Sequence, residues 1–202
     1  FVFDTTGSMS DKRESLIACM TGFVDELEKL SLDWRASVLP FGDLTVSGDR
    51  VDGQLPFTDK AEKIKMQLRA MPKFSGGGNV GESSIEAMEA ALGKPWRSKA
   101  VKIAMLLTDD FALDSGRSVS ILDRLRKTET ICFAATVDAQ YYRAWAEQSG
   151  GRWAGISQEM DTAAILALLE GLIGDVASIA ARVHSLGAGS VRKYLELPSA
   201  PS

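Results

Sequence analysis

The sequence predicts an α/β fold, with a doubly wound, mostly parallel sheet, helices on both faces and one antiparallel edge strand. Strand-like runs alternate with helix-like runs along most of the chain. Two strand-like runs, residues 101–107 and 130–137, are mostly apolar, as expected of parallel strands covered on both faces. Such alternation is typical of a parallel sheet built from successive crossover units.

The first elements are a short strand and a long helix. Residues 1–3 form an apolar run that ends at Asp4. Residues 12–30 have helical spacing, with one apolar face made of Leu16, Ile17, Met20, Phe23, Val24, Leu27 and Leu30. The charged run at residues 11–14 is expected to be a solvated start of this helix.

The antiparallel edge is predicted from two β-like pieces, residues 34–41 and 55–57. A polar, glycine-containing loop separates them, so they could form a hairpin. Pro40 and Pro56 fit the edge of a sheet better than its centre, because proline cannot donate a ladder hydrogen bond.

The rest of the chain continues the alternation, with a short strand predicted at residues 152–156. Helices are predicted at residues 58–71, 82–92, 118–127, 139–148 and 161–173. We expect one α/β domain over residues 1–173. A C-terminal extension over residues 174–202 would contain another amphipathic helix, a short segment and a Pro/Ser tail.

Composition narrows the class of protein. The chain has 202 residues, of which 45% are hydrophobic and 25% charged, which is typical of a globular domain. A net charge of −4 argues against a nucleic-acid partner. No run of 18 uninterrupted apolar residues is present, so we expect no membrane span.

The rarest reactive residues have ordinary explanations. Cys19 lies in a helical pattern and Cys132 in a strand pattern, and both are interpreted as small buried hydrophobic residues rather than redox centres. The single histidine, His184, disfavours most zinc sites and any catalytic triad that needs an imidazole.

The loop after the first strand carries a carboxylate and two hydroxyls at alternate positions, Asp4, Thr6 and Ser8. In a turn leaving a strand, alternate side chains can converge on one point. Ligands that are all oxygen favour a hard cation such as Mg²⁺, Mn²⁺ or Ca²⁺. The alternative is that Ser8 or Ser10 only caps the following helix.

Two further loops could contribute to the same point. Glycines at residues 76–78, just before Asn79, would let the backbone approach another group closely, although the loop could equally be a flexible helix start. It lacks the Gly-Lys-Ser/Thr of a phosphate-binding loop. Asp109 and Asp110 follow the most apolar strand, where buried acids are costly unless paired or bound to a cation, or else cap the next helix.

Taken in this order, the loops resemble those of the von Willebrand factor A domain family, whose Rossmann-like fold carries a metal-ion-dependent adhesion site (MIDAS). Asp4, Thr6 and Ser8 match its first motif, Asp-x-Ser/Thr-x-Ser. Asn79 stands at the second-loop position and Asp109 matches the Asp of its Thr-Asp-Gly motif. The resemblance covers about residues 1–173 and includes glycines at 150–151.

Two departures from the family pattern concern the site. The second-loop position usually carries Thr or Asp, whereas Asn79 supplies an amide oxygen and no charge. Asp110 replaces the glycine of the third motif and adds a carboxylate near the site. Glu82 is close in sequence and is interpreted as an acidic residue that only complements a helix N-terminus.

The resemblance implies a protein-binding module of the interaction or adhesion type. Its metal, Mg²⁺ or else Mn²⁺ or Ca²⁺, would be held by Asp4, Thr6, Ser8, Asn79 and Asp109. A Glu or Asp side chain of a partner protein would displace a water from it. The alternative is a degenerate domain that binds protein as a metal-free scaffold, and Asn79 is the residue that favours it.

The sequence patterns of two enzyme classes, aspartic proteases and phosphatases, match this chain poorly. Residues 4–7 look similar to the Asp-Thr-Gly loop of aspartic proteases, but Thr6 breaks the spacing and no second copy exists to complete the dyad. A phosphatase with Asp4 as nucleophile would usually have an acid two residues later, where Thr6 stands. We therefore expect no catalytic activity.

The sequence is compatible with both an intracellular and an extracellular A domain. By resemblance, intracellular A domains often work within larger assemblies, including with ATPases of the AAA+ type, and extracellular ones work in adhesion. Unpaired cysteines and the lack of a recognisable signal peptide favour the cytoplasm, although the chain does not begin with Met.

Overall fold

Five strands form one sheet in the computed structural model, in the spatial order β2-β1-β3-β4-β5. Every neighbouring pair is parallel. The strands are β1 (Val2–Asp4), β2 (Leu39–Phe41), β3 (Lys102–Thr108), β4 (Thr130–Thr136) and β5 (Trp153–Gly155). The structure describes residues 1–29, 33–78, 81–157, 159–160, 162–187 and 190–196.

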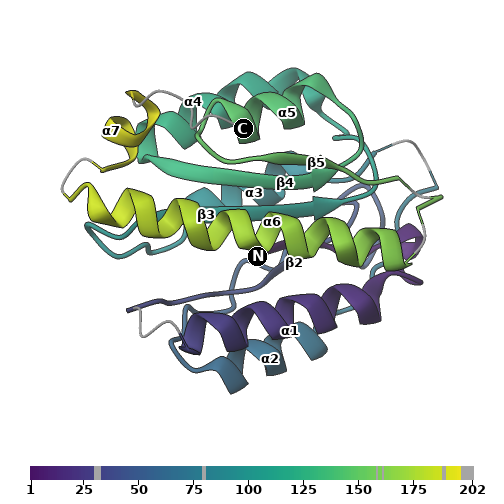
Figure 1. Cartoon of the computed structure of the whole chain (residues 1–202). Helices are drawn as coiled ribbons and strands as arrows, with labels where there is room; N and C mark the ends of the chain where they lie inside the picture. Colours follow the sequence, from purple (N-terminus) through teal and green to yellow (C-terminus); the bar gives the residue numbers. More distant parts are fainter. Residues whose placement is uncertain (30–32, 79–80, 158, 161, 188–189, 197–202) are drawn as a thin grey trace.

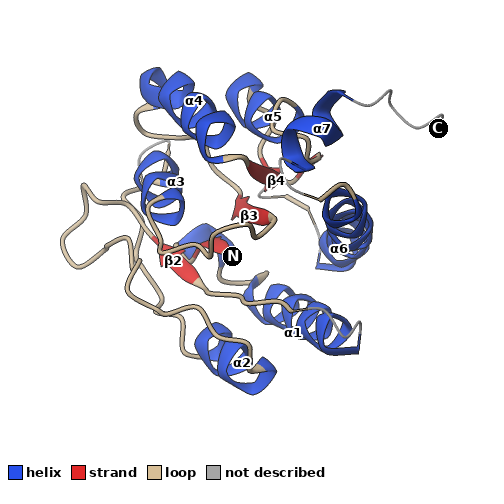
Figure 2. Cartoon of the chain, turned by 90° about the vertical axis from the view of Figure 1, so that its left-hand side faces the viewer, coloured by secondary structure: helices blue, strands red, loops and turns tan. Residues whose placement is uncertain are grey.

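Helices cover both faces of the sheet (Figures 1 and 2). One face carries α1 (Arg13–Lys29) and α6 (Thr162–Ser185), with α2 (Ala61–Arg69) packed on α1 and α7 (Ser190–Glu196) on α6. The other carries α3 (Ser84–Leu92), α4 (Ser118–Thr128) and α5 (Gln140–Glu147). Two short 3₁₀ turns, η1 (Gly7–Met9) and η2 (Ser115–Arg117), precede α1 and α4. The predicted α/β fold with a parallel sheet and helices on both faces is confirmed.

The core has two layers, because successive strand side chains point to opposite faces of the sheet. Met105 and Leu107 of β3 pack with α1 and α6, whereas Ala104 and Leu106 pack with the other three helices. Every residue of β4 is buried. Burial on both faces explains why β3 and β4 are nearly continuous apolar runs.

The edge of the sheet differs from the prediction. The edge strand on the β1 side of the sheet is β2, and it runs parallel to β1, with Leu39 opposite Val2. The predicted antiparallel edge strand at residues 55–57 is not among the strands of the described residues. Antiparallel pairing here consists of isolated bridges, such as Ala36 with Thr58. Pro56 has no N–H to extend that bridge into a ladder.

Helix α6 is longer than the helix predicted to end at residue 173. It continues through Gly174, because Ile165, Leu169, Leu172 and Val176 form one apolar stripe that packs into the core. This packing offsets the cost of about 1 kcal/mol for a glycine inside a helix. The boundary expected between residues 173 and 174 lies inside this helix, and the division into domain and extension stays a prediction.

The stretch Ala163–Ser185 of α6 is long and apolar enough to cross a membrane by length and composition alone. Core helices of soluble proteins pass the same test. Here 22% of the apolar window is buried, in the stripe that packs toward α1 and β4. A single helix of this kind is weak evidence for a span. A membrane span is therefore not supported.

The strand order determines where a site can form. From β1 the chain moves outward to β2, and from β3 it moves the other way to β4 and β5. The direction therefore reverses between β1 and β3. In open parallel sheets, ligands bind beyond the carboxyl ends of the strands at such a switch point. Asp4 ends β1, and Asp109 directly follows β3.

Candidate metal centre

The loop after β1 is tightly held. Asp4 and Thr6 are buried, and Ser8 in η1 is half-buried. Thr6 donates twice to Asp4 Oδ1, from its backbone N at 2.9 Å and from Oγ1 at 2.6 Å. Thr108, the last residue of β3, donates to Asp4 Oδ2 at 2.6 Å. Asp4 thus joins the loop after β1 to the end of β3.

A second link crosses the same switch point. Ser8 Oγ donates to Asp109 Oδ1 at 2.7 Å, between residues that lie 101 positions apart in the sequence. Thr6 Oγ1 lies 3.5 Å from Ser8 Oγ. Four of the five predicted ligands, Asp4, Thr6, Ser8 and Asp109, therefore form one connected group. The fifth, Asn79, lies outside the described residues.

The glycine-rich loop is seated against this group. Phe74 N donates to the carbonyl oxygen of Thr5 at 3.0 Å, and Gly76 N donates to Asp49 Oδ2 at 2.9 Å. Gly76 has φ of +70°, and a Cβ there would lie 3.2 Å from Thr6 Cβ. Glycine at this position therefore allows both the backbone conformation and the close approach.

Glu82, which follows the glycine-rich loop, is a candidate that the sequence reasoning treated only as a helix-start residue. Its side chain is buried beside Thr6, and Oε2 has no hydrogen-bond partner among the described residues. Burial, and after it the charges of Asp4, Asp43 and Asp110, together raise the pKa of Glu82 from 4.5 to about 8. A buried carboxylate oxygen without a donor is the kind of group that a cation would satisfy.

Asp43 was missed entirely, because no motif surrounds it. It follows β2 and is buried, and its Oδ1 accepts two hydrogen bonds from Thr45. Its Oδ2 has no partner among the described residues. Leu44 N donates to Ser83 Oγ at 2.9 Å, which brings this loop against the start of α3 next to Glu82.

The charged run at residues 11–14 was predicted to be solvated, and this is wrong for Lys12 and Arg13, which are buried, whereas Asp11 and Glu14 are exposed. Lys12 is 2% exposed, and its Nζ lies 3.3 Å from Asp109 Oδ2. Arg13 is also buried and donates to the backbone oxygens of Met71 and Pro72. The side chains of Lys12 and Arg13 both point inward, because the tertiary structure provides partners for them that the local sequence does not reveal.

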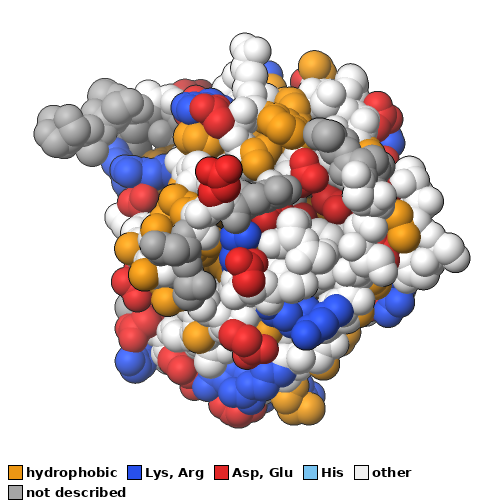
Figure 3. Space-filling view, turned by 90° about the vertical axis from the view of Figure 1, so that its right-hand side faces the viewer, with side chains coloured by type: hydrophobic (Ala, Val, Ile, Leu, Met, Phe, Trp, Pro, Cys, Tyr) orange, Lys and Arg blue, Asp and Glu red, His pale blue; other side chains and the backbone are white. Residues whose placement is uncertain are grey.

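The electrostatics of Asp4 follow from its position. Burial raises its pKa from 3.8 to about 6, and the nearby charge of Asp109 acts in the same direction. The hydrogen bonds from Thr108 and Thr6 oppose this shift without cancelling it. Figure 3 views the end of the molecule where the strands finish, and acidic side chains lie around the middle of that face.

The donor set suits a hard divalent cation. Thr6 and Ser8 donate their hydroxyl protons to Asp4 and Asp109, which leaves hydroxyl lone pairs free to bind a cation. Carboxylate and hydroxyl oxygens are ligands that Mg²⁺, Mn²⁺ and Ca²⁺ accept. Within the described ranges, no group of three or more His, Cys, Asp or Glu side chains is placed to hold a metal ion. Such a site would therefore depend on its hydroxyls.

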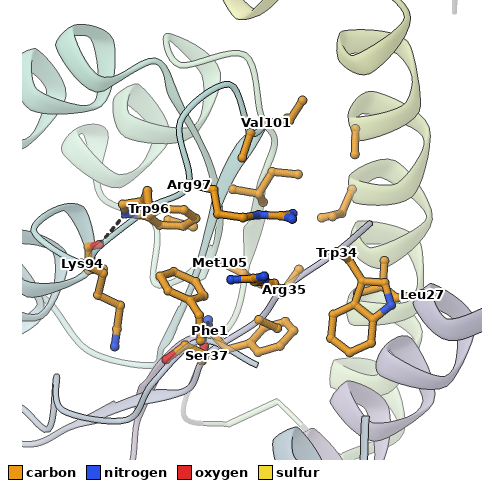
Figure 4. A pocket seen from close by; sticks show the side chains of 18 of the residues that line it. Phe1, Leu27, Trp34, Arg35, Ser37, Lys94, Trp96, Arg97, Val101 and Met105 are labelled. Carbon is orange, nitrogen blue, oxygen red and sulfur yellow. Dashed lines mark hydrogen bonds between the residues drawn. The ribbon is translucent and has the colours of Figure 1, made fainter. Parts of the chain in front are cut away.

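A cavity lies away from this group, at the opposite end of β3. It measures about 630 Å³ and includes Trp34, Trp96 and Met105 among its lining residues (Figure 4). Leu106 is the first residue of β3 that pairs with β1, opposite Val2. The four residues of β3 before it extend toward the other end of the sheet, and the cavity opens beside them. None of Asp4, Thr6, Ser8 and Asp109 lines it.

Comparison with known proteins identifies the same fold. A model of the von Willebrand factor type A domain family matches residues 1–153. Two solved structures of proximal thread matrix protein 1 from the mussel byssus align at 16% identity, with TM-scores of 0.62 and 0.63. One of them is described as having a zinc-occupied MIDAS motif. Each alignment covers 87% of this chain, which spans 44% of theirs. No curated protein matches.

Proposed function

We propose, because the chain belongs to the von Willebrand factor type A domain family, that it is a divalent-cation-dependent protein-binding module. Asp4, Thr6, Ser8 and Asp109 would hold the cation, with Asn79 as the fifth ligand. The observation that carries the proposal is the 2.7 Å bond between Ser8 and Asp109, which brings two distant loops to one point. We propose no catalytic role.

The residues would act mainly by positioning oxygen atoms. Thr108 and the backbone of Thr6 fix both oxygens of Asp4, so this carboxylate needs little rearrangement to face a cation. The hydroxyls of Thr6 and Ser8 bring oxygen ligands without negative charge. When bound, a divalent cation with such ligands supplies an electrophilic position for a carboxylate of a partner protein.

The proposed cation is Mg²⁺, with Mn²⁺ and Ca²⁺ as alternatives. Carboxylate and hydroxyl oxygens are hard ligands, and thiolate and imidazole ligands are not part of the proposed set. The zinc-occupied motif of the mussel byssus protein supports a divalent metal in this fold and does not specify which one would bind here. The unpartnered Oε2 of Glu82 supports a cation near Thr6.

A metal-free scaffold is the alternative function, and a specific observation favours it. Both carboxylate oxygens of Asp4 and both of Asp109 already have hydrogen-bond partners. Lys12 supplies one of these partners and brings a positive charge to the site. In this alternative the loops would be held in place without metal, and the domain would bind protein through its surface alone.

Thermal unfolding distinguishes the two functions. The parent protein, Asp4→Ala and Ser8→Ala are melted in EDTA and then with Mg²⁺, Mn²⁺ or Ca²⁺, with Asp123→Ala on the exposed face of α4 as the control. A cation at about a hundred times its Kd adds roughly 2.7 kcal/mol to the free energy of unfolding. We expect this shift in the parent and the control only. A folded parent that shows no shift with any cation would favour the metal-free scaffold.

A further inference from the structure

Lys12 is a buried lysine whose ammonium lies inside the proposed site. Its side chain is 2% exposed. Nζ lies 3.1 Å from the backbone oxygen of Ser8, 3.3 Å from Asp109 Oδ2 and 3.3 Å from Asp11 Oδ1. A lysine ammonium has three N–H donors, so these three acceptors satisfy it completely.

The backbone fixes this placement. Lys12 N donates to the carbonyl oxygen of Met9 in η1, and Leu16 N in α1 donates to the carbonyl oxygen of Lys12. The residue therefore sits at the junction of the two elements, directly beneath the loop that carries Ser8. Arg13 cannot take over its role, because its guanidinium is held by the backbone of residues 71 and 72.

We propose that the ammonium of Lys12 is the resident counter-ion of the metal-free site and competes with a divalent cation for Asp109. The inference rests on the proposed metal-binding function and concerns the regulation of that site. Asp109 is buried, and without metal its charge requires a partner, which Lys12 provides. A divalent cation at the same carboxylate would meet a like charge held a few ångströms away.

Asp11 gives the ammonium a position to which it can withdraw. Its side chain is 74% exposed and its Oδ1 lies 3.3 Å from Nζ, whereas the side chain of Asp109 is fully buried. Binding of a cation would therefore release the contact with Asp109 while the contact with Asp11 persists. The exchange costs free energy, so Lys12 lowers cation affinity and stabilises the domain when metal is absent.

The test compares Lys12→Met with Lys65→Met. Methionine keeps the length of the lysine stem and removes the charge. Lys65 on α2 is a matched control, since its side chain is only 13% exposed and pairs with Asp25 and Glu62 away from the site. Each folded protein is titrated with Mg²⁺ and Mn²⁺ by calorimetry, and its unfolding is measured in EDTA.

We expect Lys12→Met to bind the cations at least about tenfold more tightly than the parent, because a unit charge is removed close to them. In EDTA the same variant should unfold more readily than the parent. Lys65→Met should keep the parent's Kd. If Lys12→Met folds poorly, the amine ¹⁵N resonance of Lys12 in the parent is followed during Mg²⁺ titration, and it should shift as Asp109 is released.

The remaining outcomes either overturn or support the inference, and they separate its failure from failure of the proposed function. Equal or weaker cation binding by folded Lys12→Met, beside a parent that binds, refutes competition and leaves the proposed function standing. An unchanged Lys12 resonance at saturating Mg²⁺ does the same. No binding by the parent or by Lys12→Met refutes both the competition and the metal-dependent function. Binding by Lys12→Met alone supports competition strong enough to exclude the metal from the parent.

Discussion

The buried carboxyl of Asp4 should make the metal-free protein less stable as the pH rises. The pKa of Asp4 is raised from 3.8 to about 6 in the folded state, so folding favours the protonated form. Its contribution is fully present below the unfolded pKa and is lost as the pH rises through the folded one. A shift of about two pKa units corresponds to roughly 3 kcal/mol, most of it lost between pH 4 and pH 7.

The assay is urea unfolding in EDTA at a series of pH values, with Asp4→Asn as the comparison. Asn is nearly isosteric, its Oδ1 can accept both donors of Thr6, and Thr108 Oγ1 can accept from its amide. The difference in unfolding free energy between parent and variant cancels the groups that are not coupled to Asp4, and it reports Asp4 together with its charge effect on Glu82. We expect this difference to change by about 2–3 kcal/mol across the range, in favour of the variant at high pH. Parallel pH profiles would refute the reasoning.

Three further perturbations test the packing around the site. Thr108→Val should destabilise the protein by about 1.5–3 kcal/mol, measured by urea unfolding, because it removes the donor to a buried oxygen of Asp4. Gly76→Ala should cost more stability than Gly78→Ala in the same assay. Both glycines have positive φ, but a Cβ would meet close neighbours only at the first of them. The thiol of Cys132 is buried with its pKa raised to about 12, so a thiol reagent should modify it no faster than the protein unfolds.

The helices and the long strands could be predicted because their signals are local. Ile121 and Leu125 recur at helical spacing and are the buried residues of α4. All seven residues of β4 are buried, and the mostly apolar run in the sequence predicted this burial. Patterns of this kind depend on neighbours a few residues away, so no knowledge of the tertiary structure is needed to recognise them.

Strand pairing at the edge could not be predicted in the same way. The run at residues 34–41 is β-like, but only Leu39–Phe41 pairs with β1 as a strand. The direction and extent of pairing depend on the path of the intervening loop, where Asp49 accepts hydrogen bonds from Ser75 and Gly76. Those contacts join segments 26 and 27 residues apart, and composition gives no sign of them.

The candidate site shows the same contrast between features that local sequence predicts and features that depend on tertiary contacts. The convergence of Asp4 and Asp109 was predictable, because Asp4 ends one parallel strand and Asp109 follows another, and both strands end at one edge of the sheet. Lys12 was misjudged because a charged residue in a charged run is usually solvated, and only the tertiary structure places Asp109 beside it. Asp43 carried no motif at all. The charges that balance a buried site are thus harder to predict than its ligands.

Charge balance also links the experiments to one another. The site buries several carboxylates, and a proton, the ammonium of Lys12 or a divalent cation can each compensate them. Since these compensating charges repel one another, the presence of one should weaken the binding of the next. Cation affinity should therefore fall as the pH drops through 6, where Asp4 becomes protonated. This decrease in cation affinity at low pH should also occur in Lys12→Met, because the proton binds Asp4 whereas the ammonium of Lys12 pairs with Asp109. If that variant instead lost its pH dependence, Lys12 would act through Asp4 and not through Asp109.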